Sequence, residues 1–337
     1  MKSNIKAISY YLPEKVLTNE DLMKEFPGFK VNDMTRLTGV YRRHIAAEEE
    51  TTSDLAVKAA EKLFIEHSIH PADIDHILFC TQGGDYLTPT TACLIQDRLN
   101  IPKHAGAVDF NQGCTGFIYG LSMAKGLIET GTAGNVLLLT SETITKLIHP
   151  EDKSNRAIFG DGAAATLISG AEEGTAGIGD FVFGTDGRGY DAIIIKHGGV
   201  RYPYQKVKPV DYTDQFGNVR NDGCFYMDGS AVFTFSVEIV TKLIDELLKK
   251  IGKSANDIDL FVLHQANQVI LESIFRKMKL PEEKTIIYLK ECGNTIASTI
   301  PIAMKHAVDE GKVKSGDNVL LAGFGVGFSW AGTVVTL

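Results

Sequence analysis

The amino-acid sequence contains a weak internal duplication, and this repeat constrains the possible folds more than any other feature. Four segments recur in the same order along the chain, and three of the pairs are offset by 180 to 184 residues. The pairs are DIDHILFCTQ (73–82) with DIDLFVLHQA (257–266), NVLLLT (135–140) with NVLLAG (318–323), the segment from Phe110 with that from Lys290, and IFGDGAAATLI (158–168) with GFGVGFSWAGTVV (323–335). Offsets this long exceed any solenoid period, so we expect two homologous halves, residues 1–170 and 171–337.

Both halves show the same order of apolar patterns. An amphipathic helix comes first, over 54–69 with Ser53 as a possible N-cap and over 236–251 in the second half. Short apolar strands alternate with helices after it, which is typical of an α/β fold with mixed, mostly parallel sheets. The predicted strands are 76–80, 107–110 and 135–140 in the first half, and 260–264, 286–289 and 318–322 in the second.

Two helices at equivalent places in the halves are rich in small residues. The helix after Phe110 carries several glycines, which weaken an isolated helix. Its counterpart should begin near Ser298, because Pro301 is tolerated only in the first turn of a helix. Close packing against neighbouring backbone would compensate for the glycines. We therefore expect these two helices to pack together between two sheets.

Composition excludes several classes of protein. Hydrophobic residues make up 44% of the 337 residues and charged residues 23%, as in ordinary globular proteins, so disorder and coiled coils are excluded. A net charge of −8 argues against nucleic-acid binding through bulk charge. The five cysteines form no CxxC pair, which argues against a zinc site or a disulfide framework. There is no signal-like N-terminus and no apolar run of about 18 residues, so we expect a cytoplasmic protein without a membrane span.

Three residues with catalytic potential follow predicted strand ends. Cys114 stands in NQGCTGF at the start of a helix, where the helix dipole lowers the pKa of a thiol, although a free cysteine is also commonly a small buried hydrophobe. His264 ends the strand LFVLH, and Asn294 lies in ECGNT; a structural hydrogen bond and a turn are the simpler interpretations of these two. However, Asn294 is the repeat counterpart of Cys114, and open α/β sheets place ligands at strand ends. The three side chains should therefore meet at one site.

Two glycine-rich segments resemble a phosphate-binding loop and a nucleophile elbow but do not match the full pattern of either motif. GFGVG (323–327) leads into a predicted strand and not into a helix, so a Rossmann fingerprint or a phosphate-binding loop is disfavoured. NQGCTG (111–116) lacks the GxSxG pattern of a nucleophile elbow. The stretch 195–227 has no periodicity but many aromatic residues, so we expect an ordered loop that covers part of the protein.

Taken together, these motifs resemble β-ketoacyl-acyl carrier protein synthase III, a family of thiolase-like condensing enzymes. The resemblance runs nearly end to end and includes YYLPEKVLTNEDL, TGVYRRHIAAEEETTSDLA, the Cys114 segment, FGDGAAA, HQAN (264–267), GNT (293–295) and GFGVGFSW. It implies a five-layered α-β-α-β-α duplication and a homodimer. It also implies substrates that are thioesters of coenzyme A or acyl carrier protein, with no metal or redox cofactor.

The resemblance further implies a decarboxylating Claisen condensation in the biosynthesis of fatty acids or related metabolites. Cys114 would take the acyl group as a thioester, and His264 and Asn294 would hydrogen-bond the carbonyl of a malonyl-thioester. Backbone N–H groups of Cys114 and Val326 would hold the acyl oxyanion. Phe324 would lie beside the decarboxylation site.

Other positions implied by the resemblance concern substrate binding. Thr88 falls where some members carry a bulky Phe at the acyl pocket, so we expect room for an acyl group longer than acetyl. Lys153 and Asn267 are expected to bind the thioester substrate. Several positions that contact coenzyme A or the carrier protein in the family have changed, which suggests a divergent member: Asp33 replaces Trp, Leu37 and Val269 replace Arg, and Thr234 replaces Lys.

Several alternatives stay open at this point. The same fold also hosts acyltransferases that form esters or amides without decarboxylation, enzymes that condense two acyl chains head to head, and inactive subunits. Synthesis of 3-hydroxy-3-methylglutaryl-coenzyme A is disfavoured, since the segment before Thr81 offers no general-acid Glu. An acidic carrier protein would need a local basic cluster on this acidic chain, and the candidates are Arg42, Arg43, Lys206 and Lys208, or Lys249 and Lys250.

Overall fold

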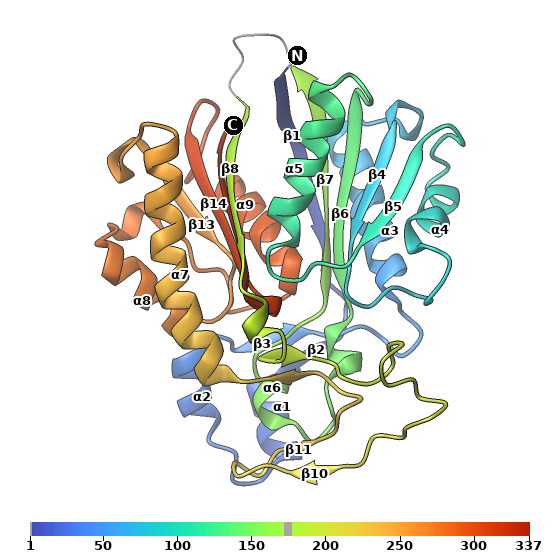
Figure 1. Cartoon of the computed structure of the whole chain (residues 1–337), viewed down its shortest axis with the longest axis vertical. Helices are drawn as coiled ribbons and strands as arrows, with labels where there is room; N and C mark the ends of the chain where they lie inside the picture. Colours follow the sequence, from blue (N-terminus) through green and yellow to red (C-terminus); the bar gives the residue numbers. More distant parts are fainter. Residues whose placement is uncertain (1, 172–176) are drawn as a thin grey trace.

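A computed structural model describes residues 2–171 and 177–337, which form two β-sheets with helices on both sides of each sheet (Figure 1). The five-stranded sheet has the order β1-β7-β6-β4-β5, and the four-stranded sheet has the order β13-β14-β15-β8. The strands of the first sheet are β1 (Lys2–Tyr11), β4 (His76–Cys80), β5 (Gly106–Phe110), β6 (Asn135–Glu142) and β7 (Gly162–Ala171). Those of the second are β8 (Ile178–Thr185), β13 (Leu260–Leu263), β14 (Asn318–Gly325) and β15 (Ser329–Thr336).

Both sheets are mixed, as predicted, but parallel pairing does not predominate. The parallel pairs are β4–β5, β4–β6 and β13–β14, whereas β1–β7, β6–β7, β14–β15 and β8–β15 are antiparallel. The turn 326–328 shows the physical reason in the second half. Three residues between β14 and β15 are too few for the crossover that a parallel pair requires.

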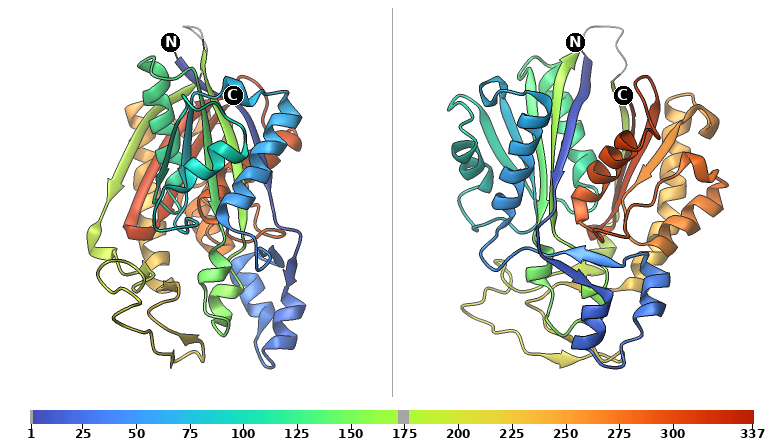
Figure 2. Two further views of the ribbon diagram at one scale, coloured as in Figure 1. Left: turned by 90° about the vertical axis from the view of Figure 1, so that its right-hand side faces the viewer. Right: turned by 180° about the vertical axis from the view of Figure 1, so that it is seen from behind.

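Helices lie in three layers around the two sheets. Helices α3 (Thr52–His67) and α4 (Thr91–Arg98) cover the outer face of the first sheet, and α7 (Gly229–Lys250) and α8 (Gln268–Met278) cover the outer face of the second. Helices α5 (Gly116–Glu129) and α9 (Thr299–Asp309) lie between the sheets (Figures 1 and 2). The predicted five-layered α-β-α-β-α arrangement is therefore confirmed.

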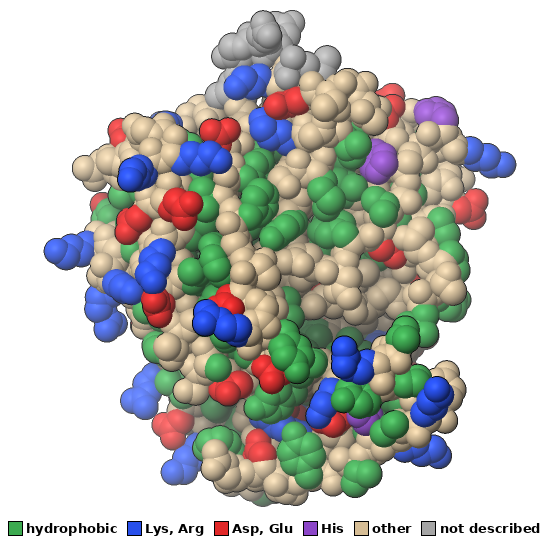
Figure 3. All heavy atoms as spheres, viewed as in Figure 1, with side chains coloured by type: hydrophobic (Ala, Val, Ile, Leu, Met, Phe, Trp, Pro, Cys, Tyr) green, Lys and Arg blue, Asp and Glu red, His purple; other side chains and the backbone are tan. Residues whose placement is uncertain are grey.

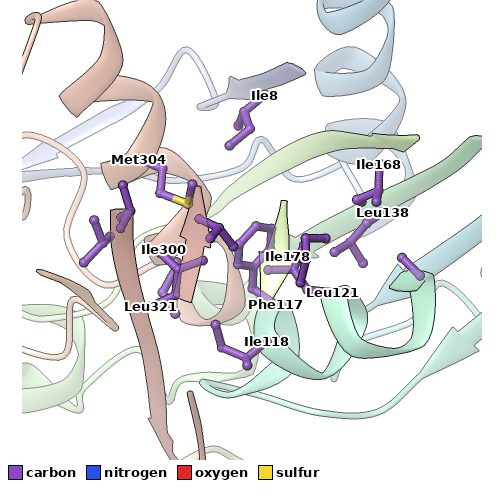
Figure 4. Close-up of a cluster of buried hydrophobic side chains, with 14 of the residues drawn as sticks. Ile8, Phe117, Ile118, Leu121, Leu138, Ile168, Ile178, Ile300, Met304 and Leu321 are labelled. Carbon is purple, nitrogen blue, oxygen red and sulfur yellow. The ribbon is translucent and has the colours of Figure 1, made fainter. Parts of the chain in front are cut away.

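The central layer joins both sheets through one hydrophobic core. Phe117 and Leu121 of α5 and Ile300 of α9 pack against apolar side chains from both sheets, including Leu138 and Leu321 (Figure 4). The glycines of α5 allow this close approach, because a Cβ on Gly116 would lie 2.2 Å from the Cys80 sulfur. As predicted, α9 begins directly after Ser298 and holds Pro301 in its first turn.

The strands of the first sheet all lie between residues 2 and 171, and those of the second between 178 and 336. Strands β4, β6 and β7 correspond in the sequence repeat to β13, β14 and β15. On this ground we propose that 1–170 and 171–337 are the two copies of one duplicated unit, fused by their shared core.

Three predictions of local structure are wrong. Thr51, not Ser53, caps α3, because Thr51 and Asp54 form a capping box. Helix α7 begins seven residues before Ser236, where the Asp228 carboxylate caps it. Residues 286–289 form no strand, since the Gln265 side chain accepts the backbone N–H of Tyr288 at 2.7 Å.

Smaller elements surround one end of the sheets. They are α1 (Asn19–Glu25), α2 (Val31–Thr38), α6 (Lys153–Arg156), β2 (Val16–Thr18), β3 (Arg42–His44), β9 (Ile193–Ile194), β10 (Tyr212–Thr213), β11 (Val219–Arg220) and β12 (Tyr226–Met227). The segment 195–227 is an ordered loop containing the β10–β11 hairpin, and it is tied to the first half by the hydrogen bond from Phe225 N–H to the Leu147 carbonyl. Among the described residues, no helix has the length and apolarity needed to cross a membrane.

Candidate active site

Cys114 lies in the turn between β5 and α5, and the residue is 7% exposed. The C-terminal end of β14 packs directly against this turn. A Cβ on Gly325 would lie 2.7 Å from the Cys114 sulfur, and a Cβ on Gly323 would lie 2.8 Å from its carbonyl oxygen. Glycine at both positions therefore lets the second half of the chain reach the thiol and brings the backbone N–H of Val326 to it.

Burial, and not the helix dipole, dominates the ionisation of Cys114. Loss of solvation raises the pKa of its thiol to about 11, although the N–H groups of Val326 and Cys114 act in the opposite direction. The prediction that the start of the helix lowers this pKa is wrong for the resting protein, because a buried thiolate loses more hydration than these donors return. Cys114 is a neutral thiol near neutral pH.

His264 follows β13 and is held through one ring nitrogen. Its Nδ1 lies 2.7 Å from the Thr299 hydroxyl, which donates its own hydrogen to the Ile296 carbonyl at 2.9 Å. With the single hydroxyl hydrogen placed on the Ile296 carbonyl, we assign Nδ1 as the donor, which leaves Nε2 as the nitrogen that a substrate or the thiol can use. Burial lowers the pKa of His264 to about 3, which keeps the imidazole neutral.

Asn294 is oriented so that one hydrogen stays free. Its Oδ1 accepts the N–H of Ile296 at 2.9 Å, and its Nδ2 donates to the Ala266 carbonyl at 3.3 Å. An amide nitrogen carries two hydrogens, so one remains for a ligand. The backbone of Asn294 is fixed on both sides by hydrogen bonds with Ile158 and Gly160.

The three candidate residues line one cavity. Phe324 also lines it and meets the His264 ring edge-on, with the ring centroids 5.5 Å apart. Asn267 and Val326 lie on the same wall, although the Oδ1 of Asn267 is already engaged as the N-cap of α8. The remaining wall is mostly apolar, contributed by Ile158, Phe159, Ile193, Phe225, Met227, Val232, Ile270 and Ile296.

The cavity adjoins a wider pocket at the protein surface, which we call the mouth. Ile158, Met227 and Gly229 line both. Arg220 lines the mouth and is held by the Asp214 carboxylate, 3.0 Å from its Nε. Lys153 precedes the mouth residue Ser154 and extends over the ring of Phe26, 6.0 Å from its centroid, so it lies outside the cavity.

Two other predicted positions lie elsewhere. Thr88 is exposed, next to the 96% exposed Leu87, and does not line the cavity of the single chain. Arg43 is fully buried and donates to Asn19 and Ala157, so the prediction that it belongs to a surface cluster is wrong. Hydrogen bonds to the Asn19 amide oxygen and the Ala157 carbonyl compensate the buried guanidinium for its lost hydration. These acceptors lie far from Arg43 in sequence, so the sequence alone does not reveal that Arg43 is buried.

Several residues around the site were missed from the sequence. Thr299 fixes the histidine, and nothing in its helical context marks it. Glu142 is fully buried behind the site, where it accepts the N–H of Gln82 at 2.8 Å, and burial raises its pKa to about 8. A carboxylate that ends the apolar run NVLLLTSE was the available signal. Gln82 and Ser236 also line the cavity.

Comparison with known proteins identifies the family. Residues 108–187 match the model for 3-oxoacyl-[acyl-carrier-protein (ACP)] synthase III, and residues 248–337 match its C-terminal counterpart. The chain is 36% identical over 327 residues to a β-ketoacyl-[acyl-carrier-protein] synthase III from Caldanaerobacter subterraneus subsp. tengcongensis, with 96% of this chain and 95% of the relative covered. The chain belongs to the β-ketoacyl-[acyl-carrier-protein] synthase III family. It is therefore an acyltransferase of fatty acid biosynthesis that catalyses a decarboxylating condensation.

Solved structures agree with this assignment. A 3-oxoacyl-(acyl-carrier-protein) synthase III crystal structure is 46% identical, with a TM-score of 0.97 and full coverage of both chains. A more distant structure, a variant of Xanthomonas campestris OleA, is 19% identical and shares the fold at a TM-score of 0.84, covering 100% of this chain and 98% of its own.

The raised pKa of Cys114 predicts how fast this thiol is alkylated at different pH values. With a thiol pKa of about 11, raised above its usual value, the thiolate fraction grows about tenfold for each pH unit between 7 and 10. Inactivation by iodoacetamide should accelerate in the same proportion, measured by mass spectrometry of the Cys114 peptide. The exposed Cys93 serves as the internal reference. A Cys114 rate that is already constant by pH 8 would contradict this account.

Proposed function

We propose that Cys114, His264 and Asn294 are the catalytic residues of the condensation, with Cys114 as the acylated nucleophile. The observation that carries the proposal is their convergence, from both halves of the chain, on one mostly apolar cavity. The cavity supplies a thiol, an uncommitted imidazole nitrogen and an uncommitted amide hydrogen. These are the groups that acyl transfer and enolate stabilisation require.

In the first half-reaction, the thiol of Cys114 attacks the carbonyl of an acyl-thioester. Because the resting pair is a neutral thiol and a neutral imidazole, the proton leaves the sulfur during attack, and the unprotonated Nε2 of His264 receives it. Backbone N–H groups of Cys114 and Val326 stabilise the oxyanion. The proton then passes to the departing thiolate, so the products are acyl-Cys114 and a free thiol.

In the second half-reaction, Asn294 Nδ2–H donates to the thioester carbonyl of a malonyl group. The malonyl carboxylate raises the pKa of the neighbouring imidazole, so His264 takes one proton from solvent at Nε2 and donates it in a hydrogen bond to the same oxygen. Loss of CO2 leaves an enolate whose carbon attacks acyl-Cys114. The sulfur of Cys114 leaves and takes the proton from Nε2, which restores the resting state.

Variants of Asn294 and Cys114 separate the two half-reactions. In N294A we expect normal formation of acyl-Cys114 from an acyl-thioester, because acylation does not use the amide. Release of CO2 from a malonyl-thioester should fall about 100-fold or more, the usual effect of losing one oxyanion donor. Intact-protein mass and labelled CO2 measure the two steps. C114A, the control, should form no adduct, and unchanged decarboxylation in N294A would refute the proposed role.

The proposed substrates are thioesters of coenzyme A or acyl carrier protein, and the mouth is their entrance. The exposed Lys206 and Lys208 lie in the loop that leads to the mouth residue Tyr212. Lys249 and Lys250 stand at the opposite end of the 22-residue helix α7 from the mouth residue Gly229, about 30 Å away. In Figure 3, basic and acidic side chains are interspersed over α7, whereas several basic side chains lie over the loop at the lower right. We therefore assign carrier docking to Lys206 and Lys208.

Charge reversal tests this assignment. The double variant K206E/K208E should raise the KM for malonyl-acyl carrier protein several-fold and leave the KM for malonyl-coenzyme A nearly unchanged, since only the carrier protein presents a large acidic surface. The matched variant K249E/K250E should alter neither. Equal effects of the two double variants would contradict docking at the loop.

A homodimer formed through β5 is also part of the proposal. Strand β5 pairs only with β4 among the described residues, and its Val108 is 42% exposed. The loop carrying Leu87 and Thr88 is attached to the same strand, because the Thr90 hydroxyl accepts the N–H of Asp109 at 2.9 Å. An exposed edge strand beside apolar side chains favours pairing with a second copy, which would take Thr88 to the partner's side.

The proposed dimer can be tested by its mass in solution. Sedimentation equilibrium should give twice the 36.7 kDa chain mass, and V108K should reduce it to the monomer mass.

A cytoplasmic location completes the proposal. Its support is that all five cysteines are free thiols, the state maintained in a reducing compartment.

A further inference from the structure

Helix α7 presents one polar side chain to the catalytic cavity, Ser236. Gly229, Val232 and Ser236 are spaced three and four residues apart and therefore lie on one face of the helix, which runs from the mouth inward. Gly229 also lines the mouth, so Ser236 lies about 10 Å farther along the helix. The deepest position on this face thus carries a hydroxyl group.

The Ser236 hydroxyl is fully buried and has no hydrogen-bond partner in the described part of the chain. A serine or threonine inside a helix ordinarily donates to a carbonyl of the preceding turn. On the same helix, Thr234 donates to Ser230 at 3.1 Å and Thr241 donates to Glu238 at 3.0 Å. Leaving a buried hydroxyl unpaired is unfavourable, so the exception at Ser236 points to a partner that arrives with a ligand.

The position of Ser236 identifies which part of a thioester could pair with it. In the proposed reaction the thioester carbonyl lies at the inner end of the cavity, beside Cys114 during acylation and beside Asn294 during decarboxylation. The next polar group of a cysteamine-based thioester, toward the mouth, is the amide two methylenes from the sulfur. Asn267 lines the same cavity and has only its Nδ2 hydrogens free, because its Oδ1 accepts the Ile270 N–H at 2.8 Å. Asn267 can therefore donate a hydrogen bond to the carbonyl of the substrate amide but cannot accept one from its N–H.

We propose that Ser236 Oγ accepts the N–H of the amide nearest the sulfur and so selects thioesters that carry this amide. The inference rests on the proposed function, because it requires that thioesters enter this cavity. Ser236 is a positioning residue for the substrate arm and takes no part in proton transfer. A site built to pair with a polar group rejects analogues that lack it, because its own polar group then stays unpaired.

Acylation of Cys114 by three thioesters of one acyl chain tests the proposal. The coenzyme A and N-acetylcysteamine thioesters both carry the amide, and an S-propyl thioester does not. In S236A, kcat/KM for acylation should fall about fivefold to tenfold with the first two substrates, the effect of one neutral hydrogen bond, and stay unchanged with the third. Equal losses on all three substrates, or no loss on any, would overturn the proposal.

A matched control and a stability measurement exclude a general packing effect. T241A removes a buried hydroxyl from the same helix away from the cavity, so it should leave all three rates unchanged. Thermal unfolding should show S236A at least as stable as wild type and T241A less stable, since only Thr241 loses a hydrogen bond. If wild-type Cys114 accepts no acyl group from any thioester, the proposed function itself is wrong. If the wild type is acylated normally and S236A is acylated at the same rates, only the inference about Ser236 is wrong.

Discussion

The contact between the Cys114 turn and the C-terminal end of β14 is the constraint on which the site depends. Gly323 lies so close that a Cβ would be 2.8 Å from the Thr115 Cα, and Gly325 lies equally close to the thiol. On the other side of the contact, a Cβ on Gly113 would be 2.5 Å from the Val326 side chain. Three glycines therefore allow two sheets to share one site. A larger side chain at any of them would separate the Cys114 thiol from the backbone N–H of Val326.

The burial of the site determines the protonation states of its titratable side chains. The same loss of solvent raises the pKa of Cys114, lowers that of His264 and raises that of Glu142. All three groups favour their neutral forms, and among the residues that the structure describes they take part in no ion pair. In the proposed reaction a charge enters only with the malonyl carboxylate, and in an apolar cavity that charge would act strongly on the imidazole. Thr299 matters for this reason, because it leaves Nε2 as the position where a proton is gained and lost.

Sequence patterns predicted the α/β class and that Cys114, His264 and Asn294 meet at one site, because both predictions depend on local signals that the duplication repeats, whereas the five layers were implied by the family resemblance. The strand His76–Cys80 and the place of Pro301 were predicted correctly from hydrophobic runs and backbone chemistry. Interactions between distant segments account for the failures. The Tyr288 N–H donates to the Gln265 side chain and not to a neighbouring strand, so the predicted strand does not form. Arg43 is buried because it donates hydrogen bonds to Asn19 and Ala157. The sign of the Cys114 pKa shift failed for the same reason, since burial comes from β14, about 210 residues away in sequence.

The proposed duplication allows equivalent positions of the two halves to be compared. Ser53 precedes Ser236 by 183 residues, within the offset of the repeat, and both serines are buried on the corresponding helices α3 and α7. In the first half, the Ser53 hydroxyl donates to the Asp85 carboxylate at 2.6 Å and accepts from Arg98. In the second half, the equivalent hydroxyl has no such partner among the described residues and faces the catalytic cavity instead. If the halves are two copies of one unit, as proposed, Ser53 stabilises the fold of its own half, whereas Ser236 is the hydroxyl left available for the proposed substrate contact.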